Sequence, residues 1–447
     1  MKPRSYLDHN ATSPLRPEAR AAMVAAFDSV GNPSSIHAEG RAARQIVEDA
    51  RETVAAVFEV DASQVYFTSG GTEAANWLLQ PRRGETLAVC AVEHPCILSG
   101  HRFETGKLQA VPVLEDGAID LNALEAALSP GSAAAVQAAN NETGVVQPTA
   151  EIAEIVHSKG AVLICDAVQA VGRLPLRELK GADVLFFSAH KFGGPKGVGA
   201  AVVRNPAFAP PPLLKGGGQE RRQRSGTENV PGIAGLAAAW EVAVSEQATF
   251  AARAKALQNT LECGIRDIAP DAVIFGVPSA GVFQHGAPNG RISPHPVLLP
   301  VGEGTPELPA AEILASQKAS SPRRACAGQG QGEGEGSELR VCANRLPNTT
   351  CFAVPGKSAG VSLIAFDLDG VAVSSGSACS SGKVERSHVL VAMGAPAELS
   401  RGAIRVSTGW TTTEADIERF LTVLSRICER RSVRHEICSS PQAGHAV

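Results

Sequence analysis

Two nucleophilic side chains stand in polar, glycine-rich surroundings that favour chemistry over packing. Cys379 lies in the run SerSerGlySerAlaCysSerSerGlyLys at 374–383, which has almost no apolar residue beside it. A thiol in such a run is exposed, so its reactivity is the better explanation of its presence. Lys191 lies between an imidazole and a glycine-rich turn, in SerAlaHisLysPheGlyGlyProLysGly at 188–197, which is a setting typical of a lysine that forms a Schiff base. Together the two groups favour pyridoxal phosphate (PLP) chemistry on a sulfur compound.

Further polar side chains follow two apolar runs that are typical of buried strands. Asp166 ends one run and is followed by Gln169, while Ser188 ends the next and is followed by His190. A buried carboxylate is costly unless it pairs with a cation, and the protonated ring nitrogen of PLP is such a cation. An aspartate at a strand end is more often a helix cap. However, the ends of neighbouring parallel strands meet at one edge of a sheet, so we expect these groups to converge with Lys191.

A glycine pair precedes the first helix-like segment of this alternating pattern. Gly70 and Gly71, followed by Thr72, offer bare backbone N–H groups, a hydroxyl and the positive end of a helix dipole to a phosphate. The alternative is an ordinary tight turn with a threonine cap, which this segment alone does not exclude. It is not a Walker loop, and Gly356-Lys357-Ser358 also lacks the required glycine upstream.

Composition excludes several classes of protein. The 447 residues allow two or three domains, and the net charge of −4 with only 4% aromatic residues argues against nucleic-acid binding. The N-terminus is polar and no stretch of about 18 apolar residues occurs, so we expect a cytoplasmic protein without a membrane span. Ten cysteines without a CxxC pair favour neither a disulfide scaffold nor a metal site.

The elements that must position these residues alternate between strand and helix. This alternation predicts an α/β domain with a largely parallel sheet. The expected strands are 64–68, 87–92, 134–139, 162–166, 184–188 and 199–203, and the expected helices are 71–80, 121–128 and 149–159. A long helical pattern from 231 to 268 then leads to a smaller α+β unit with strands at 350–354 and 361–366 and a helix at 414–430.

Many short motifs, in order, resemble those of group I cysteine desulfurases of the NifS/IscS type, class V members of the fold-type I PLP enzymes. They are TyrLeuAspHisAsnAlaThr at 6–12, AsnProSerSerIleHis at 32–37, SerGlyGlyThrGlu at 69–73, GluHisPro at 93–95, AsnAsnGluThrGly at 140–144, AspAlaValGln at 166–169, SerAlaHisLys at 188–191, GlyGlyGlyGlnGlu at 216–220, ArgSerGlyThrGluAsn at 224–229, ArgLeuProAsnThr at 345–349, the Cys379 run and IleArgValSer at 404–407. The resemblance implies an aspartate aminotransferase-like fold. It divides the chain into a large PLP-binding domain at 11–255 and a small domain at 1–10 and 256–435, followed by a flexible tail at 436–447.

The stretch 277–343 departs from that family, in which only a few residues separate the flanking motifs. It is crowded with Pro, Gly, Ser and Gln and cannot bury enough apolar surface to offset the entropy of ordering. We therefore interpret it as a disordered insertion in the small domain, or as the product of a faulty gene model.

The resemblance also implies a role for each motif residue. Lys191 would hold PLP and move protons, with His94 stacked on the ring as an acid-base group that titrates near neutrality. Asp166 would pair with the ring nitrogen and Gln169 with the phenolic oxygen. The phosphate ligands would be Gly71, Thr72, Ser188 and His190, with Thr227 from the partner of a homodimer. The substrate carboxylate would be held by Asn141 and Arg405.

The implied reaction converts L-cysteine to L-alanine and leaves a persulfide on Cys379. The sulfur would pass to an iron-sulfur scaffold or another acceptor protein, which the sequence does not name. Three alternatives remain at this stage. These are a selenocysteine lyase, an aminotransferase that does not use Cys379, and a PLP-binding protein without catalytic activity.

The composition of 277–343 generates a prediction about proteolysis. Mild digestion should cut the chain within this stretch while the fragments stay associated and retain PLP. Gel electrophoresis under denaturing conditions, with gel filtration of the same digest, measures both outcomes. If the stretch resists cleavage as strongly as the rest of the chain, it is folded and our interpretation is wrong.

Overall fold

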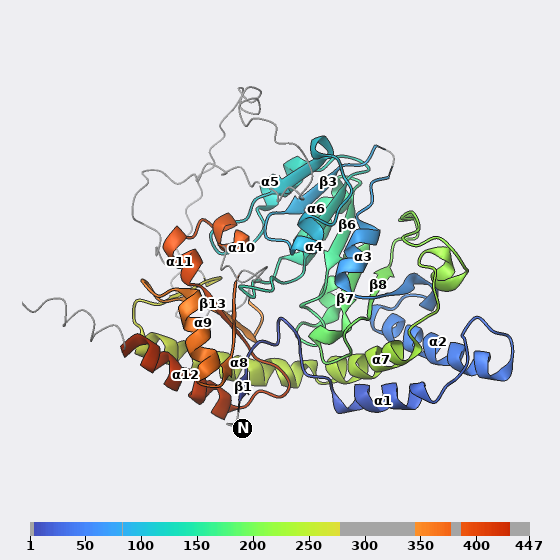
Figure 1. Cartoon of the computed structure of the whole chain (residues 1–447). Helices are drawn as coiled ribbons and strands as arrows, with labels where there is room; N and C mark the ends of the chain where they lie inside the picture. Colours follow the sequence, from blue (N-terminus) through green and yellow to red (C-terminus); the bar gives the residue numbers. More distant parts are fainter. Residues whose placement is uncertain (1–3, 83, 278–344, 377–385, 430–447) are drawn as a thin grey trace, which may run out of the picture.

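The computed structural model describes residues 4–82, 84–277, 345–376 and 386–429 (Figure 1). Cys379, the tail 436–447 and nearly all of the predicted insertion 277–343 lie outside the described residues.

A seven-stranded sheet carries most of the residues predicted to do chemistry. Its strands run in the order β2-β8-β7-β6-β5-β3-β4, and only β8 is antiparallel to its neighbours. They are β2 (Val65–Thr68), β3 (Leu87–Cys90), β4 (Leu108–Val111), β5 (Ala133–Gln137), β6 (Val162–Asp166), β7 (Val184–Ser188) and β8 (Gly199–Val203). All six predicted strands of this unit are confirmed, and β3, β5, β7 and β8 are buried at every position, as expected of strands covered on both faces.

Helices cover both faces of this sheet, as Figure 1 shows. One face packs against α3 (Gly71–Leu78) and α4 (Pro95–Leu98). The other packs against α1 (Pro17–Phe27), α2 (Ala38–Phe58), α5 (Leu121–Ala127), α6 (Thr149–Ser158) and α7 (Val230–Ser245). Trp240 of α7 is fully buried, and its ring lies 4.6 Å from Phe187 and 5.8 Å from Phe58 between centroids. Helices α3, α5 and α6 confirm the predicted helices at 71–80, 121–128 and 149–159.

A second group of elements lies beside the first. The four-stranded sheet β12-β13-β10-β9 consists of β9 (Val273–Ile274), β10 (Thr349–Ala353), β12 (Ser374–Ser375) and β13 (Ile404–Ser407). A further pair joins β1 (Ser5–Tyr6) to β11 (Val371–Ala372). Its helices are α8 (Gln247–Ile268), α9 (Ala359–Leu368), α10 (His388–Ala392), α11 (Ala397–Gly402) and α12 (Glu414–Glu429). The apolar core of this group includes Leu7, directly after β1, together with residues of α12, so the first and last described segments pack in the same core.

Two expectations for this region are wrong in part. The run 361–366 is not a strand, because it lies inside helix α9. A short apolar run cannot by itself distinguish a buried strand from a helix, and residues Val361, Ile364 and Leu368 are exposed on this helix. The pattern at 231–268 is two helices rather than one, since Glu246 ends α7 and precedes α8.

The two described ends of the stretch 278–344 lie in contact. Phe275 donates its backbone N–H to Cys351 O at 2.9 Å, and Arg345 donates to Phe275 O at 3.5 Å. Arg345 also pairs with Glu262 at 2.6 Å, where both side chains are buried. The described chain thus leaves and re-enters the fold at one place.

Within the described residues, no helix is long and apolar enough to cross a membrane.

Candidate active site

The predicted site residues meet at one edge of the seven-stranded sheet. Thr68, Asp166 and Ser188 are the last residues of β2, β6 and β7, and these strands point in the same direction. Polar side chains that follow such strand ends are brought to one rim, where open α/β sheets bind ligands. The structure therefore confirms the expected convergence of these strand ends.

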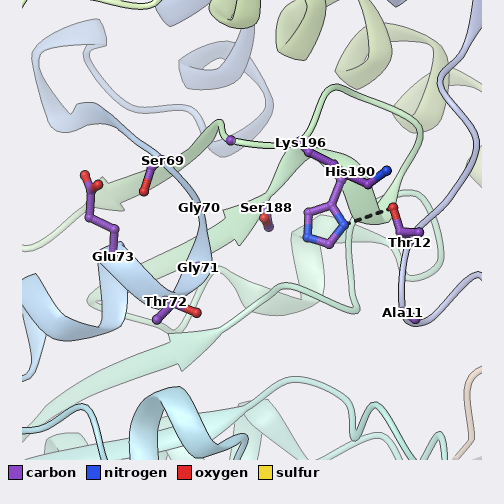
Figure 2. Close-up of a pocket in the computed structure, with 11 residues that line it drawn as sticks. Ala11, Thr12, Ser69, Gly70, Gly71, Thr72, Glu73, Ser188, His190 and Lys196 are labelled. Atoms are coloured by element: carbon purple, nitrogen blue, oxygen red, sulfur yellow. Dashed lines mark hydrogen bonds between the residues drawn. The ribbon is translucent and has the colours of Figure 1, made fainter. Parts of the chain in front are cut away.

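A cavity of about 370 Å³ opens beside this rim. It is lined by Ala11, Thr12, Ser69, Gly70, Gly71, Thr72, Glu73, Ser188, His190, Lys196 and Gly197. Figure 2 shows the loop of Gly70 and Gly71 beside Ser188, whose Oγ would lie 3.2 Å from a Cβ built on Gly70. Gly70 has a φ of +151°, and a side chain at Gly71 would place its Cβ 2.9 Å from Val168. Only glycine lets the backbone N–H groups approach this space, which suits a phosphate at the start of α3.

His190 is held at the wall of this cavity by Thr12. Their Nδ1 and Oγ1 atoms lie 3.2 Å apart (Figure 2). Desolvation by burial, followed by the positive charges of Lys191 and Lys196, lowers the pKa of His190 to about 4. The imidazole is therefore neutral at pH 7 and offers one N–H donor. Lys196 supplies a cation at the cavity that the sequence analysis did not single out.

Lys191 lies in a short 3₁₀ turn directly after β7. Its Nζ donates to Asn10 O at 2.7 Å and to Ala11 O at 3.0 Å, so the N-terminal segment forms the other wall of the site. Desolvation by burial, then the charges of Arg173 and Arg405, lowers the pKa of Lys191 to about 8. Part of the amine is therefore neutral near physiological pH, which is the form that attacks a carbonyl carbon.

Asp166 is buried at the end of β6, with 7% of its surface exposed. Its Oδ1 accepts from Val168 N at 2.8 Å, and it has no ion pair with any described cation. Burial raises its pKa to about 6, against the lowering effect of this hydrogen bond and of Lys191. A buried carboxylate without its own cation fits the protonated nitrogen of a pyridine ring.

His94 lies at the same edge, where its Nδ1 accepts from Cys96 N at 3.1 Å and caps α4. The residue is exposed to solvent, yet the protein atoms around the ring desolvate it. This desolvation, followed by the charges of Lys191 and His388, lowers the pKa of His94 below its usual value. The ring is therefore neutral at pH 7, and the acid-base role implied for His94 stays a prediction.

Arg405 reaches the site from β13 and is 6% exposed. Its Nη1 donates to Asn141 O at 3.1 Å and its Nη2 to Asp8 at 2.8 Å. Nε is buried and has no partner among the described residues. A buried guanidinium donor that has no partner suits a carboxylate ligand. The sequence analysis missed Asp8, although it lies inside the quoted motif at 6–12, because only the fold places it against β13.

A second carboxylate missed from the sequence is Glu142, which is 4% exposed. Its Oε2 accepts from Ser387 Oγ at 2.5 Å, and a Cβ built on Gly376 would lie 2.6 Å from the same oxygen. Burial raises the pKa of Glu142 to about 7. Gly376 and Ser387 stand on either side of the segment that carries Cys379, so this carboxyl group lies against both described ends of that segment and is hydrogen-bonded to one of them.

Thr227 is exposed and does not line the cavity of its own chain. Its loop is nevertheless anchored at two points. Arg51 pairs with Glu220 at 2.9 Å, both side chains being at most 4% exposed, and Arg224 pairs with Glu73 at 2.7 Å. The loop also has positive φ values at Glu220, Arg221 and Arg222, a conformation that costs free energy and requires such anchoring.

The structure thus brings together most of the residues singled out from the sequence, while Thr227 lies apart and Cys379 lies outside the described residues. The groups around the rim are Gly71, Thr72, His94, Asn141, Asp166, Gln169, Ser188, His190, Lys191 and Arg405. They provide a phosphate cradle, an unpaired buried carboxylate and a lysine of lowered pKa. This donor set fits PLP.

Comparisons with known proteins agree with this geometry. Residues 5–279 match the family described as aminotransferase class-V. The chain is 36% identical over 442 residues to a cysteine desulfurase from Cereibacter sphaeroides, with 96% of each chain covered. It is 34% identical over 442 residues to cysteine desulfurase IscS from Dictyoglomus turgidum, again with 96% of each chain covered. The X-ray structure of a NifS-like protein from Rickettsia africae superposes with a TM-score of 0.74 at 29% identity, over 96% of this chain and 100% of the other.

The Arg51–Glu220 pair generates a prediction about stability. Arg51→Met should destabilise the fold by about 3–5 kcal/mol, because it leaves the buried carboxylate of Glu220 without its cation. The free energy of unfolding from urea titration measures this loss. Arg41→Met, on the exposed surface of the same helix, is the control and should change it by less than about 0.5 kcal/mol. A similar small effect of both changes would contradict the anchoring role.

Proposed function

The chain belongs to the class-V aminotransferase family, as one of its cysteine desulfurases, and from this premise we propose how its residues carry out the reaction. L-Cysteine is converted to L-alanine, and the sulfur is received by Cys379. The observation that carries the proposal is the meeting of Lys191, Asp166 and Arg405 around one open rim. The selenocysteine lyase, the aminotransferase and the inactive PLP-binding protein are less favoured, because the relatives over nearly the whole chain are named cysteine desulfurase.

PLP, when bound, supplies an electron sink that stabilises negative charge at the substrate α-carbon. Lys191 would hold its aldehyde carbon and Asp166 its ring nitrogen. Thr72, Ser188 and His190, with the backbone N–H groups after Gly70, would hold its phosphate. The neutral state of His190 is compatible with this role, because the ring donates one N–H without adding a proton at neutral pH.

Arg405 would bind the substrate carboxylate. Its Nη2 is paired with Asp8 at 2.8 Å, while Oδ2 of Asp8 accepts from Ser374 Oγ at 2.7 Å. A guanidinium offers five donors in a fixed fork, so Arg405 can hold a second carboxylate through Nε without losing Asp8. The backbone carbonyl of Asn141 limits rotation of the same group. Binding at this point orients the α-hydrogen of the substrate towards Lys191.

Lys191 would move the proton at the α-carbon. With a pKa lowered to about 8, its amine can accept a proton near neutral pH and return it to the same face. His94, which is neutral, can accept a proton at the open side of the site. The two groups approach the substrate from different elements, so one can act at the α-carbon while the other acts at the sulfur.

The sulfur step is a displacement at the substrate sulfur. The Cys379 thiolate forms the new S–S bond, and the electron pair of the broken C–S bond remains with the carbon, which then takes a proton to become the methyl group of alanine. The thiolate is the nucleophile, so the thiol must first lose its proton. The product is a persulfide on Cys379, which an iron-sulfur scaffold or another acceptor protein would receive.

We further propose a cytoplasmic homodimer in which Thr227 completes the phosphate site of the partner. The support is the exposed position of Thr227 on a firmly anchored loop, together with the exposed apolar side chains of Phe27, Val30 and Ile36. The described cysteines are free thiols, as in a reducing compartment. We also propose the two-domain division at residues 10/11 and 255/256.

The proposed function predicts the behaviour of two variants. Cys379→Ser should bind PLP and L-cysteine and change the visible absorption of PLP, but it should release almost no alanine, because a hydroxyl at neutral pH is a poor nucleophile towards sulfur. Lys191→Ala should lose both the spectral change and turnover. The measurements are rapid-scan absorbance, an alanine assay and intact mass for the added sulfur.

Cys263→Ser is the matched control, because Cys263 is an exposed free cysteine on α8. It should keep full turnover and gain the mass of sulfur as the parent chain does. Alanine release by Cys379→Ser at the parent rate would show that Cys379 does not receive the sulfur. A demand for a keto acid would indicate an aminotransferase instead.

The composite site predicts complementation between inactive variants. Thr227→Glu should lose PLP through repulsion of its phosphate, and Lys191→Ala cannot hold PLP covalently. Mixed dimers should contain one intact site, made of Lys191 from one subunit and Thr227 from the other, and should recover PLP and activity. Co-expression with two affinity tags isolates these dimers. No recovery, or a fully active monomer in sedimentation, would refute the composite site.

A further inference from the structure

Among the described residues, Arg173 is a buried cation without an ion pair. It follows β6 by a few residues and is 4% exposed. Four other arginines in the described part of the chain are buried, and each has a carboxylate partner: Arg16 with Glu246, Arg51 with Glu220, Arg345 with Glu262, and Arg405 with Asp8. A buried charge costs free energy unless it is compensated. Arg173 therefore requires an explanation other than structural pairing within the described residues.

The donors of Arg173 point to oxygen atoms around Lys191. Nη1 contacts Gln169 O at 3.3 Å and also Gln169 Oε1, while Nη2 donates to Lys191 O at 3.1 Å and to His9 O at 3.4 Å. Carbonyl dipoles replace the water lost on burial, but they do not neutralise the charge. Burial, followed by the charge of Arg405, lowers the pKa of Arg173 to about 9, so the guanidinium stays charged at pH 7.

This arrangement determines which way the Gln169 amide faces. A guanidinium has no acceptor, so the atom that meets Arg173 must be the amide oxygen. The amide NH₂ consequently lies on the other side, where it donates to Asn10 O at 3.1 Å. Lys191 Nζ donates to the same oxygen at 2.7 Å. The NH₂ group of Gln169 and the amine of Lys191 thus stand beside each other.

We propose that Arg173 is a positioning residue that turns the NH₂ of Gln169 towards the anionic phenolic oxygen of bound PLP and supplies the positive charge that this oxygen balances. The proposal rests on the proposed function, in which Lys191 holds PLP. Arg173 would not touch the cofactor itself. It would act by orienting the amide of Gln169 and by its positive charge. This role explains why Arg173 has no carboxylate partner among the described residues, because such a partner would neutralise its charge.

The same charge acts on Lys191. Burial lowers the pKa of this amine most, and Arg173 then lowers it more than Arg405 does. Asp166 and Asp8 oppose them, while His94 and His190 face the amine as neutral rings. Removing the cation should make it easier for Lys191 to keep its proton, so its pKa should rise.

The test compares Arg173→Met and Arg173→Gln, which are neutral, with Arg173→Lys, which keeps the charge but not the planar fork. Arg177→Met is the control, because Arg177 is an exposed cation four residues away. In cofactor-free protein, acetylation of Lys191 by acetic anhydride is followed against pH by peptide mass spectrometry. The neutral variants should raise the midpoint by about one pH unit, while Arg173→Lys and the control leave it unchanged.

A second measurement uses protein loaded with PLP. The pH titration of its visible absorption should shift upwards by about one unit in the neutral variants and not in Arg173→Lys. The dissociation constant for PLP should rise about tenfold in all three, because each loses the fork that orients Gln169.

A lower melting temperature with an unchanged acetylation midpoint in both neutral variants would make Arg173 a structural residue and overturn the inference. Unchanged PLP affinity in Arg173→Lys would overturn the orienting role. The acetylation measurement needs neither cofactor nor substrate. If the acetylation midpoint shifts but the parent chain releases no alanine from L-cysteine, the proposed function is refuted. The effect of Arg173 on Lys191 would still hold.

Discussion

Asn10 is the hydrogen-bonding centre on which the site depends. Its carbonyl oxygen accepts from Lys191 and Gln169, which follow β7 and β6, and its side chain donates to Thr349 Oγ1 of β10 at 2.9 Å and to Asn141 O at 3.0 Å. Its backbone N–H donates to Ser407 Oγ of β13 at 2.9 Å. One buried residue, 1% exposed, therefore joins both groups of elements to Lys191. Without it, several buried polar groups would lose a partner, each at a cost of about 1–3 kcal/mol.

The site built around Asn10 holds more positive than negative charge. Lys191, Arg173 and Arg405 are cations, while Asp8 is paired with Arg405 and the pKa of Asp166 is raised by burial. Such an excess is unfavourable for the chain alone and favourable once a phosphate, a phenolic oxygen and a carboxylate are bound. The repulsion among these cations destabilises the folded chain, but it strengthens the binding of anions and lowers the pKa of Lys191. Functional sites commonly depart in this way from the most stable arrangement.

The second sheet supplies contacts that the first cannot make. Arg405 on β13 and Ser374 on β12 are opposite each other in register, and both contact Asp8 near the N-terminus. Glu142 accepts a hydrogen bond from Ser387 and lies close to Gly376. Arg405 and Ser374 are therefore joined through one carboxylate. A change at either should be felt at the other, because both donate to Asp8.

Much of the fold and site followed from the sequence alone, since buried parallel strands and glycine-rich turns have local signatures. The six strands of the large sheet, the glycine turn before α3 and the rim that joins Asp166, Ser188 and Lys191 were predictable, because strand direction decides where the ends of strands lie. The helix at 361–366 was not predictable, because its apolar residues have no decisive period. Asp8, Glu142 and Arg173 were also missed, because they act on residues that the chain brings near only after folding.

The sequence determined which chemical groups are available, whereas the tertiary structure decided which of them are paired. It is for this reason that Arg173 alone, among the buried arginines of the described chain, has no carboxylate partner.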